Sequence, residues 1–375
     1  MKVLVAGDFC QRDRVDAYIK NRRFGDLFDE VKPLLQKVDY SIVNFEFPIV
    51  SDNSVVSPIV KCGPNLKGTN GAVEALVYAG FNCCTLANNH ILDQGQDCCI
   101  ETIKQLENAG IDTIGAGKDL SEAGKVLYKQ INGETLAVIN CCEHEFTIAS
   151  KNSAGANPLN PINQFYAIQE AKTKADFVLV IVHGGHEHYQ LPSPRMQEIY
   201  RFFVDVGADA VVNHHQHCFS GYEFYKETPI IYGLGNLCFD HPKKRKDNWN
   251  EGYIANIEFK KNSKVKLDII PYFQCNESVG VNLNEDNADF FMKLDKLNKI
   301  ICSQELEKEY KIYLERRGKV ETLVHLPFTN KVLMKLHSMG IMPSFVSRRK
   351  WAKLLNYIET ESHRDIQIEA IKSKL

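Results

Sequence analysis

The sequence predicts an α/β protein with two helix-covered sheets, followed by a helical appendage. Short apolar runs alternate with amphipathic segments over residues 2–109, as in a largely parallel sheet with helices packed outside. The alternation returns at 161–212, and strand-like segments without intervening helices follow. Long helical segments take over after about residue 282. We therefore expect one large domain at 1–280 and a helical C-terminal extension at 281–375.

The first part of the chain is expected to begin with a buried strand and then to alternate helices and strands. Gly80 follows one of the helical segments directly, as suits a helix C-terminus. The predicted strands are 2–7, 40–45 and 82–87, and the predicted helices are 24–37, 69–79 and 95–109.

The second part combines a hairpin, two further strand and helix pairs, and a run of antiparallel strands. Asn132-Gly133 lies between two strand-like segments at 125–139 and is the strongest short hairpin signal. The predicted helices are 161–174, 194–206 and 287–303, and the predicted strands are 177–182, 210–212, 222–225, 228–232, 253–260 and 265–272.

Composition and charge exclude several classes of protein. The chain has 375 residues, of which 44% are hydrophobic and 25% charged, enough for a sizeable buried core. Its formal net charge of -2 gives no overall attraction for nucleic acid or an anionic membrane. We therefore expect no nucleic-acid partner.

The N-terminus and the cysteines indicate a protein of a reducing compartment. Residues 1–9 lack the length and cleavage site of a signal peptide, and no apolar run reaches the roughly 18 residues of a membrane span. The 12 cysteines include three adjacent pairs in apolar runs and form no C-x-x-C spacing, so we expect buried free thiols. We expect a cytoplasmic protein with no transmembrane segment.

Polar residues able to bind a metal occur repeatedly where an apolar strand ends. In open α/β sheets, ligands bind outside the carboxyl ends of the strands, so five such ends would bring these residues together. The residues at these ends are Asp8; Glu46; Asn89 with His90; His183; and His214, His215 and His217.

The donor types narrow the choice of metal. Carboxylate, amide oxygen and imidazole without thiolate suit Mn²⁺, Fe or Zn²⁺. Six or seven donors exceed the needs of one tetrahedral zinc ion. We therefore predict two divalent ions roughly 3.5–4 Å apart with a bridging carboxylate, a centre that hydrolyses phosphate esters and, less often, amides.

Each of these residues also has a purely structural interpretation. Asp8 would serve as a helix N-cap, Glu46 as a solvated loop residue, and Asn89 as a turn former. The histidines at 214–217 are harder to explain by packing, because adjacent histidines at a strand end rarely serve it. Singly the residues are weak indicators, but jointly they predict a metal centre.

Eight short runs stand in order along residues 1–275, and together they resemble a known family. The runs are GDF at 7–9, NFEFP at 44–48, LANNHILDQG at 86–95, GIDTIGAG at 110–117, HGGHEH at 183–188, LPS at 191–193, VGADAVVNHHQH at 206–217 and YGLGNLCFD at 232–240. In order and approximate spacing they resemble the CapA/PgsA family of capsule and poly-γ-glutamate synthesis, whose domain is similar to calcineurin-like metallophosphatases. The resemblance implies a metallophosphatase-like four-layer α/β/β/α sandwich of two mixed sheets, with a C-terminal helical appendage.

The resemblance also implies a role for each matched residue. Glu46 would be the bridging carboxylate, and His90 would be the general acid for the leaving group. His215 is preferred over His214 as the first histidine of the last motif. The remaining implied ligands are Asp8, Asn89, His183 and His217; Glu187 and Asn236 would orient the ligands.

Several positions depart from the family pattern or leave alternatives open. Metallophosphatases open with Asp-x-His, whereas position 10 is Cys10, which we interpret as a buried inert thiol rather than a thiolate ligand. Asn213 stands where a glycine is expected, and Gly184 where an aromatic residue is expected. Lys61 and Lys67 would contact an anionic substrate, although exposed, solvated lysines are the more frequent case.

The function implied is a metal-dependent hydrolase. The resemblance favours a phosphoesterase acting on a phosphorylated metabolite or glycan-linked substrate in capsule or exopolysaccharide biosynthesis. The alternatives are a poly-γ-glutamate amide hydrolase or transferase, and a non-catalytic accessory protein of polymer synthesis. The expected partners are an anionic small-molecule or glycan substrate, and either further copies of the chain or other polysaccharide-synthesis proteins.

Overall fold

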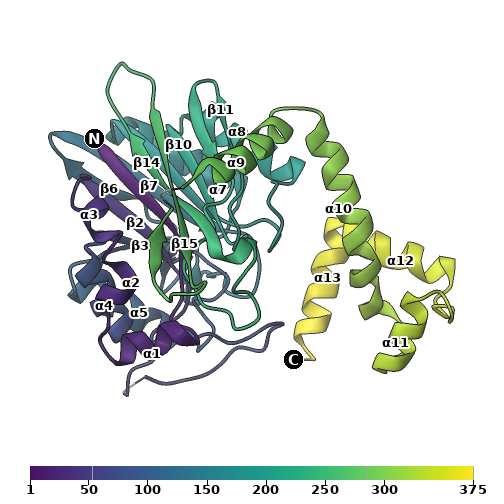
Figure 1. Cartoon of the computed structure of the whole chain (residues 1–375). Coiled ribbons are helices and arrows are strands. Elements are labelled where there is room, and N and C mark those ends of the chain that lie inside the picture. Colours follow the sequence, from purple (N-terminus) through teal and green to yellow (C-terminus); the bar gives the residue numbers. More distant parts are fainter. Residues whose placement is uncertain (53, 285, 375) are drawn as a thin grey trace. The chain divides into compact units, whose positions relative to one another are not determined.

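The computed structural model describes residues 1–52, 54–284 and 286–374. The chain divides into two compact units, Met1–Leu306 and Glu307–Leu375. The first unit contains two large sheets and the helices that cover them (Figure 1). The second unit consists of helices.

The first sheet has eight strands and mixes parallel with antiparallel pairs. β1 (Lys2–Phe9) pairs in parallel with β2 (Tyr40–Phe45), and β3 (Cys83–Thr85) and β4 (Asp112–Ile114) continue the parallel half. On the other side β1 is antiparallel to β14, and its end pairs in parallel with β13. The remaining strands are β13 (Asn236–Cys238), β14 (Glu251–Glu258), β15 (Lys266–Gln274) and β16 (Val281–Leu283).

The second sheet has six strands, with a parallel centre between two antiparallel edges. Its order is β11-β12-β10-β9-β7-β6, and β12, β10, β9 and β7 are mutually parallel where they pair. A small separate sheet joins β5 (Ala116–Gly117) to β8 (Gly155–Ala156). The strands of the six-stranded sheet are β6 (Leu127–Ile131), β7 (Glu134–Cys142), β9 (Phe177–His183), β10 (Ala210–His214), β11 (Tyr222–Tyr225) and β12 (Thr228–Ile231).

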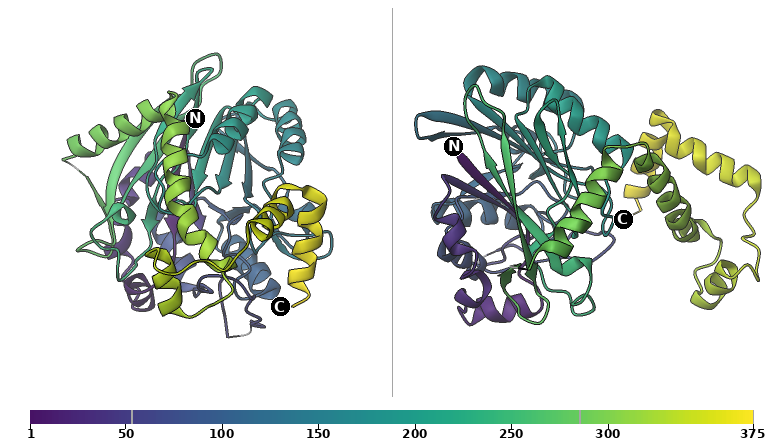
Figure 2. Two further views of the ribbon diagram at one scale, coloured as in Figure 1. Left: turned by 90° about the vertical axis from the view of Figure 1, so that its right-hand side faces the viewer. Right: turned by 45° about the horizontal axis from the view of Figure 1, so that its top comes forward.

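Three hydrophobic cores define four layers, helix, sheet, sheet and helix. Alternate residues of β1 face opposite sides: Val3 and Val5 pack toward the second sheet, whereas Leu4 packs toward the helices. Helices α1 (Arg14–Lys20), α2 (Gly25–Phe28), α4 (Gly71–Ala79) and α5 (Gln96–Asn108) contribute to the core on that outer face. Helices α7 (Pro161–Lys174) and α8 (Pro194–Val206) cover the second sheet. Figure 2 shows these layers from two further sides, and the predicted four-layer sandwich of mixed sheets is confirmed.

The best-predicted elements carry strong local signals. Both α7 and α8 have a proline in the first turn, and the N-cap side chains of Asn160 and Ser193 accept backbone N–H groups. Asn132 and Gly133 have φ of 51° and 83°, as a type I′ turn between β6 and β7 requires. The predicted hairpin is therefore confirmed.

The helix predicted over 24–37 is wrong. Two short helices, α2 and α3 (Lys32–Leu35), replace it. Pro33 lies in the first turn of α3, where its missing N–H group costs no hydrogen bond, whereas inside one continuous helix it would remove a backbone hydrogen bond. The proline therefore starts a new helix instead of continuing one.

The first unit extends past the boundary expected at residue 280. Helix α9 (Ala288–Ile301) places Phe290 and Leu294 in the core between the sheets, and Phe290 packs on Phe219 with ring centroids 4.7 Å apart. Leu306 belongs to the core on the outer face of the second sheet. The second unit contains η2 (Thr322–His325), α11 (Lys331–Ser338), α12 (Arg348–Glu359), α13 (Glu361–Lys372) and most of α10 (Glu305–Glu321).

The cysteines follow the expected pattern. Ten of the 12 are buried, and only Cys62 and Cys302 are exposed. All 12 are free thiols. None of the helices in the described ranges is long and apolar enough to cross a membrane.

Candidate metal centre

The carboxyl ends of β1, β2, β9 and β10 meet between the two sheets. In the first sheet Asp8 pairs with Asn44, two residues before Glu46. In the second sheet His183 pairs with His214 as the last residue of each strand. Parallel strands end at the same edge, so the topology gathers side chains from four separate segments.

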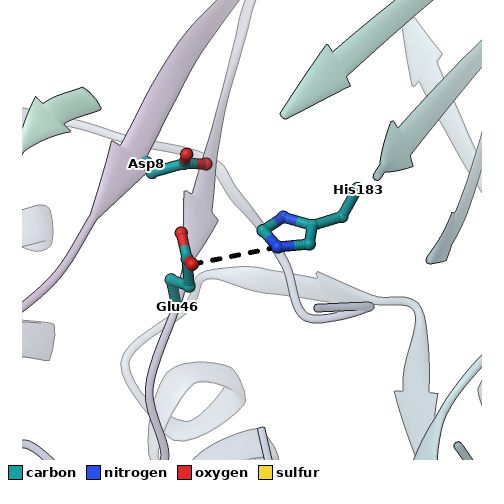
Figure 3. Close-up of side chains that lie close together, drawn as sticks. All are labelled: Asp8, Glu46 and His183. Carbon is teal, nitrogen blue, oxygen red and sulfur yellow. Dashed lines mark ion pairs between the residues drawn. The ribbon is translucent and has the colours of Figure 1, made fainter. Parts of the chain in front are cut away.

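Asp8, Glu46 and His183 form the centre of the site. One ligand atom from each lies within 4.8 Å of the others, and all three side chains are buried. Figure 3 shows them converging from their separate strands, with His183 Nε2 3.8 Å from Glu46 Oε1. This is a suitable set of oxygen and nitrogen donors for a divalent cation.

Asn89 and His215 join the centre on the side of His183. Asn89 Oδ1 lies 3.1 Å from His183 Nε2, and His215 Nδ1 lies 3.1 Å from the same atom. We call Asn89, His183 and His215, together with the shared Glu46, the His183 half of the site.

His217 joins the centre on the side of Asp8. Its Nδ1 lies 3.4 Å from Asp8 Oδ2, and its Nε2 lies 3.6 Å from Glu46 Oε1. We call Asp8 and His217, together with the shared Glu46, the Asp8 half of the site. Glu46 is therefore common to two overlapping sets of donors.

The loop after β10 is held in a backbone conformation that histidine rarely adopts. His215 and His217 have φ of 88° and 54°, and such strained residues cluster at functional sites. Asn213 stabilises the loop, since its Nδ2 lies 2.8–3.0 Å from three carbonyl oxygens and its Oδ1 accepts the Tyr200 hydroxyl at 2.7 Å. The asparagine that replaces the expected glycine thus has a structural role.

His214 and His215 occupy different sides of the centre. His214 Nδ1 lies 3.1 Å from Asp8 Oδ1, whereas His215 faces His183 and places its Nε2 3.4 Å from Glu145 Oε1. Both rings are buried. The geometry places His215, the residue preferred from the sequence, with Asn89 and His183.

The electrostatics differ around the two carboxylates. Burial opposes ionisation of Asp8, but interactions with the imidazoles of His214 and His217 hold its pKa well below the usual value. Burial, together with the negative charge of Asp8, raises the pKa of Glu46 well above its usual value. Nearby positive charge does not outweigh these two effects, so the ionised form of Glu46 is disfavoured.

The pKa values of His183 and His217 are shifted in opposite directions. Burial lowers the pKa of His183 well below its usual value, and the neighbouring His215 adds to this effect. Burial also acts to lower the pKa of His217, but the hydrogen bond and charge of Asp8 outweigh it and raise that pKa. His183 is therefore a neutral donor, whereas His217 acts as a partner of Asp8.

Three buried polar atoms at the centre have no hydrogen-bond partner among the described residues. They are Glu46 Oε1 and both ring nitrogens of His214, of which Nδ1 has only the ion-pair contact with Asp8. Buried polar atoms are nearly always paired, and an ion is one explanation for those that are not. The donor set therefore fits divalent metal binding.

Asn44 organises the centre, although it was not among the predicted site residues. Its Nδ2 lies 2.7 Å from Asp8 Oδ1, 3.2 Å from Glu46 Oε2 and 3.3 Å from His183 Nδ1. An amide nitrogen has only two hydrogens, so the three proposed metal ligands share the two hydrogen bonds that Asn44 Nδ2 can donate. Its position two residues before Glu46 at a strand end was the available signal.

His90 lies beside the centre within a buried group of charges. Its Nδ1 is 2.6 Å from Asp93 Oδ2, and Lys61 forms an ion pair with the other oxygen of Asp93. Lys61 Nζ is also 3.0 Å from His90 Nδ1, and its side chain is 2% exposed. Lys61 is thus not a solvated surface lysine but part of the surroundings of His90.

The other predicted site residues lie at different distances from the centre. Asn236 Oδ1 is 2.9 Å from His217 Nδ1, and its Nδ2 donates to the His217 carbonyl, so it orients that ring. Glu187 is half exposed, and its pKa is lowered because His217 and His215 outweigh its burial. Lys67 is exposed and, within the described residues, makes no hydrogen bond or ion pair with the cluster. Burial, with the charge of Glu46, raises the pKa of Cys10 well above its usual value, which favours the neutral thiol.

Residues 2–241 match the family described as "Bacterial capsule synthesis protein PGA_cap". The chain is similar to the "Capsule biosynthesis protein CapA" of Bacillus anthracis, 29% identical over 277 residues that cover 72% of this chain and 67% of that protein. It is also similar to the "PGA biosynthesis protein CapA" of Bacillus subtilis (strain 168), 30% identical over 268 residues that cover 71% of this chain and 69% of that protein. A protein of Mycobacterium tuberculosis described as a probable polyglutamine synthesis accessory protein is 26% identical over 216 residues, covering 54% of this chain and 56% of that protein.

The chain is also similar to solved structures of low sequence identity. A novel phosphatase of Mycoplasma pneumoniae has 16% identity and a TM-score of 0.42, with coverage of 78% of this chain and 98% of that chain. A 5'-nucleotidase precursor of Thermus thermophilus has 13% identity and a TM-score of 0.44, with coverage of 78% and 57%.

Proposed function

Because the chain belongs to the bacterial capsule synthesis protein family PGA_cap, we propose that it is a metal-dependent hydrolase. Its reaction is the hydrolysis of a phosphoester, on a phosphorylated metabolite or glycan-linked substrate of capsule or exopolysaccharide biosynthesis. The observation that supports this is the pair of donor sets that share Glu46, with the His90–Asp93 pair beside them.

Each half of the site would hold one divalent ion, Mn, Fe or Zn. Asp8, His217 and Glu46 are the donors of the Asp8 half, and Asn89, His183, His215 and Glu46 are those of the His183 half. Such a pair of ions supplies Lewis acidity and an activated water molecule. Glu46 would contribute to both ions, since it is the donor common to both sets.

His90 is the residue that delivers a proton to the leaving group. The 2.6 Å contact with Asp93, whose carboxylate oxygen only accepts, supports a proton on Nδ1 beside the Lys61 ammonium. The imidazole is then oriented with Nε2 available to exchange the transferred proton. Lys61 neutralises Asp93 and fixes its carboxylate, and it acts on the reaction through His90.

A second candidate function follows from the names of the relatives. Two of them are described by PGA or capsule biosynthesis and one as a polyglutamine synthesis accessory protein. On that basis the alternatives are hydrolysis or transfer at a poly-γ-glutamate amide, and an accessory role in which the cleft only binds polymer.

The test is a panel of three probes on the metal-loaded full chain. Bis(p-nitrophenyl) phosphate, p-nitrophenyl phosphate and poly-γ-glutamate are offered to the parent protein and to His90→Asn. We expect turnover of a phosphoester and a loss of about 10²-fold or more in the variant, since general acid catalysis contributes that much. Cleavage of poly-γ-glutamate alone would support the amide hydrolase, and no cleavage at all would support the accessory role.

A further inference from the structure

A basic loop between β13 and β14 lies beside the metal centre. It contains the four consecutive cations of 243–246, with the sequence Lys-Lys-Arg-Lys. The loop ends in Trp249, which is buried, and whose ring centroid lies 4.8 Å from that of His217. An aromatic contact therefore joins this loop to a proposed ligand of the metal centre.

Trp249 is held firmly in this position. Asp247 caps the short helix η1 (Asn248–Asn250) and accepts the Trp249 backbone N–H at 2.8 Å. The indole Nε1 donates to the Phe239 carbonyl at 2.6 Å. Both ends of the residue are fixed, so the indole face is a rigid platform.

Lys244 lies over this platform without an acidic partner. Its Nζ is 5.0 Å from the Trp249 ring centroid and 2.7 Å from His188 Nε2. The same Nζ also lies 3.2 Å from His188 Nδ1. Within the described residues no carboxylate lies within 4.0 Å of Lys244 Nζ.

The neighbouring Arg245 shows what a neutralised cation in this loop looks like. Its guanidinium lies 3.1 Å from Asp240, a carboxylate that also pairs with Arg14. Lys244 instead faces the rings of Trp249 and His188, and the carboxylates of Asp247 and Glu187 act on it only from beyond ion-pair distance. A partly buried cation without a direct ion-pair partner is costly, and an incoming anion would reduce that cost.

A cavity of about 240 Å³ opens at this position. Since one water molecule takes about 30 Å³ of liquid, the cavity has room for a hydrated anionic group. It is lined by His188, Cys218, Lys244, Asp247, Asn248 and Trp249.

We propose that Lys244, lying over Trp249, binds a second anionic group of the substrate, a phosphate or a carboxylate. This inference rests on the proposed function in that the first anionic group is taken to reach the metal centre. The substrate class is then a phosphoester that carries a further negative charge a few bonds from the scissile group.

Three probes of similar size test this on the metal-loaded full chain. Glycerol 1-phosphate has one anionic group, 3-phosphoglycerate adds a carboxylate, and glycerol 1,3-bisphosphate adds a phosphate. Turnover is followed by phosphate release and binding by titration calorimetry, for the parent, Lys244→Met and Lys243→Met. Lys243 is the matched control because it is an exposed cation next to Lys244. Thermal melting of each variant verifies that it is folded.

We expect the parent to prefer a two-anion probe over glycerol 1-phosphate about tenfold, the effect of one charge-assisted hydrogen bond. Lys244→Met should abolish that ratio, whereas Lys243→Met should retain it. The two-anion probe with the larger ratio identifies the group as carboxylate or phosphate.

Two results would overturn the inference: a parent without preference for a second anionic group, or a preference that survives in Lys244→Met. If no probe is turned over, the binding ratio still decides the role of Lys244. If no probe is turned over but the parent still prefers a two-anion probe and Lys244→Met does not, the result counts against the proposed hydrolase and supports the anion-binding role of Lys244.

Discussion

The two halves of the metal centre differ in how their charges are balanced. In the Asp8 half, the carboxylate of Asp8 has its own partner in His217, and each shifts the pKa of the other toward the charged form. In the His183 half, Asn89 Oδ1 and His215 Nδ1 each lie 3.1 Å from Nε2 of His183, a ring whose pKa is lowered by burial. The donors of the His183 half include no carboxylate except the shared Glu46, and Glu145 lies beside them, with its carboxylate 3.4 Å from His215 Nε2 and 3.2 Å from Asn89 Nδ2.

This difference predicts which half binds a metal ion more tightly. The Asp8 half is stable as an internal ion pair, and it has one donor fewer because Cys10 stands where metallophosphatases carry histidine. The His183 half places an amide oxygen and an imidazole nitrogen each 3.1 Å from His183 Nε2, and a cation would replace these hydrogen bonds with coordination by all three groups. We therefore expect the His183 half to bind its ion more tightly.

The largest effect is expected for Glu46→Gln, which removes the carboxylate common to both halves. We expect both ions to be lost and phosphoesterase activity to fall by more than about 10²-fold, the upper end of the cost of altering groups that support a ligand. Metal content and kcat/KM are the measurements. Two retained ions in this variant would show that the halves do not share Glu46.

The second prediction separates the halves. His183→Ala should lose one ion and retain the ion of the Asp8 half, and Asp8→Asn should do the reverse. Metal titration followed by calorimetry gives the stoichiometry and affinity of each variant. We expect the site that remains in Asp8→Asn to be the tighter one, by at least about tenfold. The opposite order would refute the comparison of the two halves.

The third prediction concerns Asn44, which contacts donors of both halves. Asn44→Leu should lower metal affinity or activity about 10–100-fold, the usual cost of removing a group that orients ligands. Ser41→Ala is the control, because Ser41 is buried on the same strand and bonds to Gly80 and Asn82 instead. Equal effects of the two substitutions would indicate a general loss of stability.

The fourth prediction is a pH dependence that differs between the halves. The raised pKa of His217 means that its proton must be displaced for an ion to bind, so the affinity of the Asp8 half falls as pH falls through that pKa. His183, with its lowered pKa, stays neutral over the same range. Acidification from about pH 8 to 5 should therefore release the ion of the Asp8 half first, measured with a chelating dye. Simultaneous release of both ions would contradict this order.

The smallest effect is expected for Cys10→Ala. The buried thiol is held neutral, so metal content should be unchanged, and the free energy of unfolding should fall by about 1 kcal/mol, as for an average buried substitution. Chemical denaturation and metal analysis are the measurements. Loss of an ion would identify Cys10 as a thiolate ligand of the Asp8 half.

Much of the fold and of the centre followed from the ends of the predicted strands. Asp8, Glu46 and His183 each end or follow a buried strand, and the parallel topology alone brings such ends together. Asn44 ends the second predicted strand together with Glu46, but it received no role because an asparagine at a strand end is equally consistent with a turn.

Other parts of the centre depend on tertiary contacts that have no local signature. Lys61 was expected to contact substrate, but the path of the loop after β2 brings it to Asp93 and His90. The contact of Trp249 with His217 joins segments whose proximity no periodicity predicts. The contact of Lys244 with His188 likewise joins segments that are far apart in the sequence.

The most direct test of the account is the metal content of the full chain, purified without chelators or a polyhistidine tag and measured by plasma mass spectrometry. The control is the double variant His183→Ala/His217→Ala, which removes one donor from each half. We predict close to two equivalents of Mn, Fe or Zn in the parent and almost none in the variant. A parent that contains no metal, and takes up none when Mn²⁺ or Zn²⁺ is added, would contradict the proposed hydrolase and leave a binding protein.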